Sequence, residues 1–255
     1  HVTGRTWIDK KFTMETNEEL QYHFMTETLR SNFYEGSWEL DKCERHSIFL
    51  SQGDYPIKGL HYMLKALPKI LKTYPDAKVY VAGNSIVNYK TIKDKIKISS
   101  YGKYLRELIQ KNHLEEKVFF LGKMNAEEMK TQFLKCATFV CPSVIENSPN
   151  SLGEAMLLGV PCVTADVGGI ASIFYKGLDG IAYPGYGSFE YAEQMDKETA
   201  QSKVLAHAVL RMWSDEEKMK EYSANAAAHA RRTHDGKVNY NRLLEIYRNI
   251  SNEEV

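Results

Sequence analysis

The sequence lacks the residue patterns of several common classes of protein. No Walker lysine motif, no zinc-ligand spacing and no Ser-His-Asp or Cys-His set is present. Its four cysteines are Cys43, Cys136, Cys141 and Cys162. Because they lack metal-ligand spacing and mostly fall in or beside apolar runs, buried and reduced thiols are expected. The chemistry must therefore be sought in other residues.

A surplus of charge and a long apolar run are also missing. The 33 basic and 33 acidic residues cancel, so bulk charge gives no argument for a nucleic-acid or membrane-surface partner. No apolar stretch reaches the length of a membrane span, and no signal peptide is visible. We therefore expect a cytoplasmic protein, with peripheral membrane contact through a missing part left open. Because residue 1 is His and the first residues read as the interior of a fold, the chain is expected to be a fragment.

The chain is organised around residues 142–169, PSVIENSPNSLGEAMLLGVPCVTADVGG. Glu146 and Glu154 bracket a Ser/Pro/Asn stretch that opens a short apolar helix. Ser148 suits the N-cap and Pro149 the first helical position, so Glu146 is expected in the loop and Glu154 one turn inside the helix. Unpaired N–H groups and the positive end of the helix dipole favour an anionic ligand at this helix start.

From residue 46 onward, short apolar runs alternate with amphipathic ones, which predicts a doubly wound α/β fold: a parallel sheet covered on both faces, with right-handed crossovers. Residues 83–101 form a Lys/Ile-rich connection whose apolar residues follow neither the helical nor the strand period. The expected strands are residues 47–51, 78–82, 118–121, 138–141, 162–165 and 180–183, and the expected helices are residues 59–73 (with a kink at Pro68), 104–112, 126–135, 150–158, 199–213, 215–231 and 238–250.

In doubly wound sheets, ligands bind beyond the carboxyl ends of the strands. Four predicted loops meet this condition: residues 52–59, 122–125, 144–150 and 166–170. In the first of them, Gly53 would let the backbone approach a ligand, and Lys58 could reach a diphosphate as a point charge.

The spacing Glu-x7-Glu, followed by Ala-Met-x-x-Gly-x-Pro and a later Gly-Gly, with Pro56-Ile57-Lys58-Gly59 upstream, resembles the C-terminal domain of retaining glycosyltransferases of family 4. The resemblance covers roughly residue 46 to the C-terminus. It implies a GT-B fold, built from two Rossmann-like domains.

The resemblance also implies a division of the chain. Residues 1–45 resemble the tail of the N-terminal domain with the linker, residues 46–235 the Rossmann-like nucleotide-sugar-binding domain, and residues 236–255 the terminal helix that crosses back. The alternative for residues 1–45 is an extension packed on the surface through Phe33, Tyr34 and Trp38.

By this resemblance, Lys58 and Glu146 are the catalytic residues: Lys58 clamps the donor diphosphate and Glu146 faces the anomeric carbon of the donor sugar. Glu154 accepts hydrogen bonds from the ribose hydroxyls. The family usually has an Arg five residues before the Lys, where this chain has Gly53; Gln52 with backbone N–H groups, or an Arg such as Arg5, would then substitute. The remaining expected binding residues are Asn147, Ser148, Pro149, Asn150 and Ser151 for the sugar and phosphates, and Gly122, Lys123 and Met124 for the base.

Each residue also has a simpler structural interpretation. Lys58 and Glu146 could be solvated, and residues 147–151 an ordinary turn. Ser151-x-x-Glu154 has the spacing of a capping box. Gly168-Gly169 would either leave room for the donor sugar or only form a turn.

The expected activity is that of a retaining transferase of the hexosyltransferase type, which moves a sugar from a nucleotide-diphosphate donor to an acceptor saccharide in surface polysaccharide synthesis. The sequence has no Asp-x-Asp, which implies transfer without a metal or other cofactor, with Lys58 and the helix start carrying the leaving-group charge. The acceptor would bind through the missing N-terminal domain, so this chain alone is expected to be inactive. The alternative is a catalytically inactive nucleotide-binding or interaction module.

Overall fold

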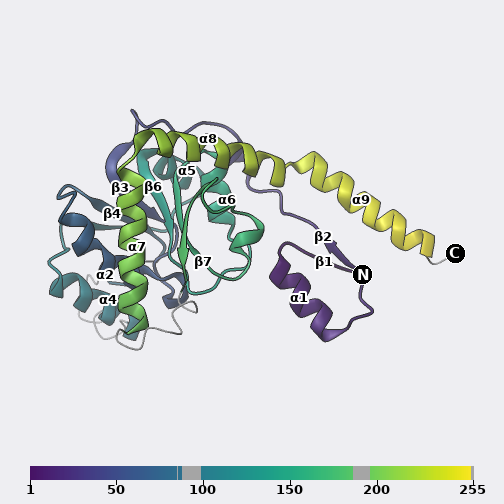
Figure 1. Ribbon diagram of the computed structural model, residues 1–255, viewed down its shortest axis with the longest axis horizontal. Helices are drawn as coiled ribbons and strands as arrows, with labels where there is room; N and C mark the ends of the chain where they lie inside the picture. The colour runs from purple at the N-terminus through teal and green to yellow at the C-terminus, as the bar shows by residue number, and fades with distance from the viewer. Residues whose placement is uncertain (85, 88–98, 186–195, 254–255) are drawn as a thin grey trace.

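The computed structural model describes residues 1–84, 86–87, 99–185 and 196–253 (Figure 1). Its main sheet has six parallel strands in the order β5-β4-β3-β6-β7-β8. The predicted doubly wound, Rossmann-like α/β fold is thus confirmed. The strands are β3 (Glu44–Leu50), β4 (Lys78–Ala82), β5 (Val118–Gly122), β6 (Cys136–Cys141), β7 (Cys162–Asp166) and β8 (Gly180–Pro184).

The chain winds in both directions from the centre of this sheet. From β3 it passes through α2 (Leu60–Leu71) to β4 and through α4 (Ser100–Lys111) to β5. It then returns through α5 (Ala126–Lys135) to β6 and continues through α6 (Asn150–Leu157) to β7. Because right-handed crossovers that progress in opposite directions place their helices on opposite faces, α2 and α4 cover one face and α6 the other.

From β3 onward, the α-helices and strands lie where the sequence predicts them, with ends shifted by up to four residues. The shifts follow local chemistry that the apolar pattern does not contain. Ser99 caps the start of α4 through its side chain, and Asn125 forms a capping box with Glu128 at the start of α5. The helix α2 continues through Pro68. The predicted connection over residues 83–101 lies largely outside the described residues.

The N-terminal segment contains a small parallel unit of its own. β1 (Val2–Gly4) pairs with β2 (Tyr22–Phe24), and α1 (Trp7–Thr16) lies between them in the chain. A short 3-10 helix, η1 (Ser31–Tyr34), follows. Phe33 is fully buried and packs edge-on against Phe133, and Trp38 is buried with its indole N–H donating to the carbonyl of Cys136. Phe33 and Trp38 therefore anchor the end of this segment in the core of the main domain.

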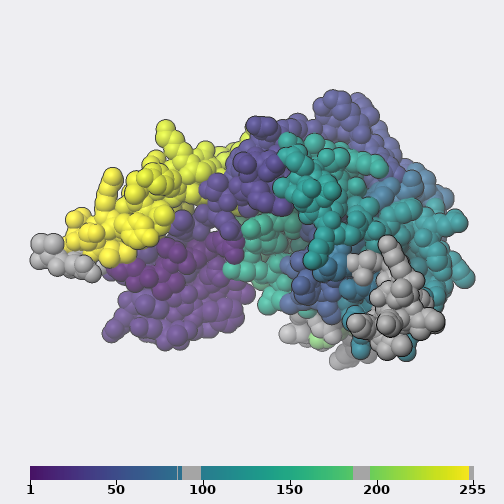
Figure 2. All heavy atoms as spheres, turned by 180° about the vertical axis from the view of Figure 1, so that it is seen from behind, coloured from purple at the N-terminus to yellow at the C-terminus, as the bar shows by residue number. Residues whose placement is uncertain are grey.

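Three C-terminal helices complete the chain: α7 (Lys197–Trp213), which packs against α2, then α8 (Glu216–Thr233) and α9 (Gly236–Glu253). α9 leaves the main body and lies along the N-terminal segment, where Arg242 donates to the carbonyl of Phe24 at 3.2 Å. Figure 2 shows this end of the molecule from behind, with α9 in yellow beside the N-terminal segment in purple.

Candidate functional site

The centre of the candidate site is a contact between Lys58 and Glu146. Lys58 ends the short 3-10 helix η2 (Pro56–Lys58) after β3, and Glu146 lies in the loop after β6. Lys58 Nζ donates to Glu146 Oε1 at 2.6 Å, and Ser143 Oγ donates to the same oxygen at 2.7 Å. β3 and β6 are neighbours whose crossovers run in opposite directions, so the contact lies at the switch point where open α/β sheets bind ligands. The sequence predicted both residues, and the fold brings them together.

Backbone contacts fix the two loops against each other. Val144 donates its N–H to the carbonyl of Ile57 at 2.9 Å. Gly59 has φ +75°, and a Cβ there would lie 2.0 Å from the carbonyl oxygen of Pro142. Only glycine tolerates both this conformation and this approach, so the sequence Lys58-Gly59 places the lysine beside the β6 loop.

The Gly168-Gly169 pair fixes the Glu146 loop from the other side. Gly169 donates its N–H to the carbonyl of Glu146 at 2.9 Å, and Gly168 has φ +54°. A Cβ on Gly168 would lie 1.9 Å from that carbonyl oxygen. The space beside Gly168 is thus filled by the backbone of the Glu146 loop, and the Gly168-Gly169 turn packs directly against that loop.

A small cavity of about 20 Å³ lies directly beside the Lys58–Glu146 contact. It is lined by residues from three sequence stretches: the end of β3 with Gln52, the end of β6 with Ser143, and Ser151 at the start of α6. Gln52, one of the predicted substitutes for the family's arginine, therefore lines this cavity.

α6 starts at Asn150, as the predicted range 150–158 has it, but its cap differs from the prediction. Pro149 is the N-cap and not the first helical residue: its ψ of 114° is extended, and its carbonyl accepts the N–H groups of Leu152 and Gly153. No side chain caps this helix, so the predicted role of Ser148 as N-cap is wrong.

The capping-box alternative for Glu154 is also wrong. Its carboxylate accepts two hydrogen bonds from Arg30, Nε to Oε1 at 2.7 Å and Nη2 to Oε2 at 2.8 Å. The side chain of Glu154 is 3% exposed, whereas that of Arg30 is 47% exposed. The Glu154 carboxylate raises the pKa of Arg30. Arg30 was not identified from the sequence, since no spacing links residues 124 positions apart.

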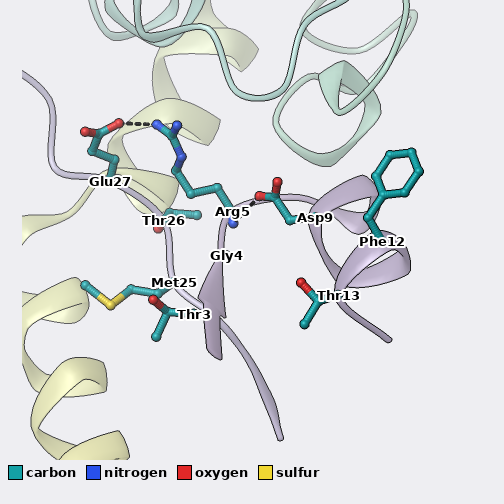
Figure 3. A pocket seen from close by; sticks show the side chains of 9 residues that line it. All are labelled: Thr3, Gly4, Arg5, Asp9, Phe12, Thr13, Met25, Thr26 and Glu27. Atoms are coloured by element: carbon teal, nitrogen blue, oxygen red, sulfur yellow. Dashed lines mark hydrogen bonds and ion pairs between the residues drawn. The ribbon is translucent and has the colours of Figure 1, made fainter. Parts of the chain in front are cut away.

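The N-terminal segment also contacts the motif loop. Thr6, the N-cap of α1, donates from its hydroxyl to Asn147 Oδ1 at 2.5 Å, and Arg5 Nη1 donates to Asn150 Oδ1 at 3.4 Å. Arg5 lies beside a groove of about 540 Å³ at the carboxyl ends of β1 and β2 and is paired with Glu27 (Figure 3). Arg5 therefore lies near the start of α6, as the alternative in which Arg5 substitutes for the family's arginine requires. Its guanidinium, however, already has a carboxylate partner in Glu27.

The other expected binding residues lie in different surroundings. Gly53 is buried, donates its N–H to the carbonyl of Ala82, and has Val81 where a Cβ would lie. Gly122 has φ +81° with open space beside it. Lys123 is exposed, and Met124 packs partly against the core. Packing therefore explains the glycine at position 53, while the region around Gly122 is open to a ligand.

The cysteines take no part in this arrangement. All four are free thiols, and Cys141 is the one beside the site, with its Sγ 3.7 Å from Ser143 Oγ. Burial, with a contribution from the Glu146 carboxylate, raises the pKa of the Cys141 thiol to about 11. It therefore stays protonated and is a poor nucleophile near neutral pH. Over the described residues, no group of three His, Cys, Asp or Glu side chains is placed to hold a metal ion.

The family model of glycosyl transferases group 1 matches residues 35–229. The chain belongs to this family.

Curated relatives include two uncharacterized glycosyltransferases of Methanocaldococcus jannaschii. One is 32% identical over 142 residues, covering 55% of this chain and 32% of that protein. The other is 26% identical over 245 residues, covering 83% of this chain and 56% of that protein. The chain thus spans between a third and somewhat more than half of the length of these relatives.

Solved structures share the fold at low identity. Anabaena HepE in complex with UDP-glucose aligns with a TM-score of 0.73 at 19% identity, covering 98% of this chain and 63% of that one. Sucrose-phosphate synthase of Thermosynechococcus elongatus aligns with a TM-score of 0.74 at 16% identity, covering 99% and 58%. No helix in the described parts of the chain has the length and apolar character needed to cross a bilayer.

Proposed function

We propose that this chain binds a nucleotide-diphosphate sugar and forms the donor half of a retaining hexosyltransferase. The observation that carries the proposal is the 2.6 Å contact between Lys58 and Glu146 at the switch point of the sheet. A cation and a carboxylate there provide the two charges that sugar transfer requires: one for the departing diphosphate and one for the positive charge that develops at the anomeric carbon.

Each further residue has a role in this proposal. Lys58 has three N–H donors and donates one to Glu146, so the other two can bind the diphosphate. The uncapped start of α6, with residues 147–151, offers backbone N–H groups to the phosphates and sugar. Glu154 receives the ribose, and residues 122–124 contact the base. The leaving-group charge is then carried without a metal.

The whole protein's activity is part of the proposal. Because HepE is solved with UDP-glucose, a UDP-sugar is the first donor to test. The acceptor is a saccharide that binds through the N-terminal domain, in cytoplasmic synthesis of a surface polysaccharide. Residues 1–255 alone transfer no sugar, because the cleft that excludes water needs both domains.

Titration calorimetry with UDP, GDP and ADP tests the donor site. We expect one of them to bind in the millimolar to micromolar range, about −4 to −8 kcal/mol. Lys58→Met should weaken this binding by about tenfold or more, since a charge-assisted hydrogen bond is lost. Lys42→Met is the matched control, because Lys42 also pairs with a glutamate, Glu39, but on the surface. No heat and no thermal shift with any nucleotide would refute the proposal.

One observation favours a second candidate, a nucleotide-binding module without catalysis: Gly53 stands where the family's phosphate-clamping arginine is expected. Turnover by the full-length protein separates the two. Release of nucleoside diphosphate that depends on acceptor supports the transferase, and binding without release supports the module.

A further inference from the structure

The Glu154 carboxylate is held by a residue outside the Glu-x7-Glu motif. Its side chain is almost completely buried, and both oxygens accept from the guanidinium of Arg30 in a two-pronged fork. A buried carboxylate is costly unless it is paired and hydrogen-bonded. Arg30 therefore compensates for the burial of this carboxylate in α6.

The fork leaves part of the carboxylate's capacity unused. An ionised carboxylate offers about four lone-pair sites, and Arg30 takes two. The two left can accept hydrogen bonds from hydroxyl groups. We propose that Arg30 is the positioning residue of the donor site, which orients the Glu154 carboxylate so that its remaining lone pairs receive the ribose diol. This inference rests on the proposed function.

The linker that carries Arg30 is itself fixed in place. Leu29 donates its N–H to the hydroxyl of Tyr34 at 3.1 Å, and that hydroxyl donates to the carbonyl of His234 at 2.6 Å. The guanidinium of Arg30 lies 4.8 Å from the ring centre of Phe33, which is fully buried. The position of Arg30 is thus set by the junction of η1 and α8, and the junction in turn sets the direction of the carboxylate.

The chemistry explains why this residue is an arginine. A guanidinium is planar and presents Nε–H and Nη2–H in parallel, which matches the two oxygens of a carboxylate. A lysine would keep the positive charge, but its ammonium group is a point charge without the planar fork, so the carboxylate could rotate. Arg30→Lys therefore separates orientation from charge, and Arg30→Gln removes both the fork and the charge.

The test compares UDP with 2′-deoxy-UDP and 3′-deoxy-UDP, because only a correctly aimed carboxylate gains from both ribose hydroxyls. The wild-type chain should bind UDP about tenfold more tightly than either deoxy form. In Arg30→Lys and Arg30→Gln, the ratio of the affinity for UDP to the affinity for each deoxy form should fall toward one, mainly through loss of UDP affinity. Glu154→Gln gives the reference value. Arg45→Lys and Arg45→Gln are the matched controls, because Arg45 pairs with Glu216 at a similar exposure away from the site, and they should keep the wild-type ratio.

The outcomes distinguish a positioning role of Arg30 from a purely structural one. A ratio that falls in the Arg30 variants and holds in the Arg45 variants supports the inference. A wild-type ratio in Arg30→Lys and Arg30→Gln, or equal weakening of UDP and its deoxy forms, overturns it, because the pair is then only structural. If Arg30→Gln does not fold by thermal melting, the ratio in Arg30→Lys decides. If the wild-type chain binds no nucleotide, the proposed function itself fails. If the wild-type chain binds UDP and both deoxy forms equally, the proposed donor site stands and only the inference on Arg30 fails.

Discussion

Glu146 and Glu154 lie eight positions apart in one motif, yet the fold places them in two different regions. Glu146 lies in the β6–α6 loop, and its cation, Lys58, comes from η2, which follows the neighbouring strand β3. Glu154 lies inside α6, and its cation, Arg30, comes from the linker before the sheet. The first pair joins two loops at the carboxyl edge of the sheet, and the second joins a helix to the linker.

The difference separates the expected roles of the two carboxylates. Lys58 is a point charge whose other donors remain for a ligand, so the charge around Glu146 can change as a donor binds and reacts. The Arg30 fork fixes both oxygens of Glu154 before any ligand arrives. A fixed contact to an unchanging part of the donor stabilises ground state and transition state alike, whereas a contact to developing charge acts on the rate.

The sharpest way to break this comparison is Glu146→Gln. If Glu146 stabilises charge at the anomeric carbon, kcat of the full-length protein should fall by about 100- to 1,000-fold with little change in the donor KM. Steady-state kinetics with varied donor measure both constants. A variant with normal kcat and a raised KM would contradict the assignment.

A second prediction concerns the glycine that supports the Glu146 loop. Gly168→Ala adds a methyl group where the Glu146 carbonyl lies, at a φ of +54°. It should destabilise the protein by about 2 kcal/mol or more, and donor binding should weaken with it. Chemical denaturation measures the free energy of unfolding.

Gly177→Ala is the matched control for this change. Gly177 has φ +78° but no atom within 4 Å of the added methyl group, so it should cost only the conformational strain of about 1 kcal/mol. Equal losses in the two variants would show that the close approach to Glu146 contributes nothing.

The two regions also differ in how far the sequence predicts them. The Lys58–Glu146 contact was predictable, because apolar runs locate β3 and β6 and the ligand rule places both residues at one sheet edge. Arg30 was not, because a linker residue has no periodic pattern that connects it to a helix. The N-cap of α6 was misassigned by one residue because Pro149 is equally compatible with the extended backbone that it adopts. Long-range contacts and cap geometry thus needed the three-dimensional structure.

A third prediction tests the Glu154 side of the comparison. Glu154→Gln should raise the donor KM of the full-length protein by about tenfold and leave kcat nearly unchanged, since the ribose does not change during the reaction. Kinetics and thermal melts of the same variant are compared. An enzyme that is destabilised yet binds donor normally would show that the Arg30 pair serves stability alone.

The last prediction uses pH to perturb the linker side without touching either carboxylate. His234 Nδ1 donates to the carbonyl of Glu27 at 2.7 Å, which places the proton on Nδ1 and leaves Nε2 against the first turns of α6, 2.8 Å from where a Cβ of Gly153 would lie. Burial lowers the pKa of His234 below its ordinary value of 6.5, although the hydrogen bond to Glu27 acts in the opposite direction.

Because this folded-state pKa is lowered, the unfolded chain binds the proton more readily than the folded chain below pH 6.5. The stability contributed by neutral His234 is therefore present above that pH and is lost as the pH falls through it toward the lower folded-state value. The thermal midpoint should fall between pH 7.5 and pH 5.5, and it should fall less in His234→Gln, whose amide can still donate to Glu27. The exposed His113→Gln is the control and should follow the wild type. If His234→Gln also follows the wild type, protonation of His234 does not loosen the contact between the linker and α6.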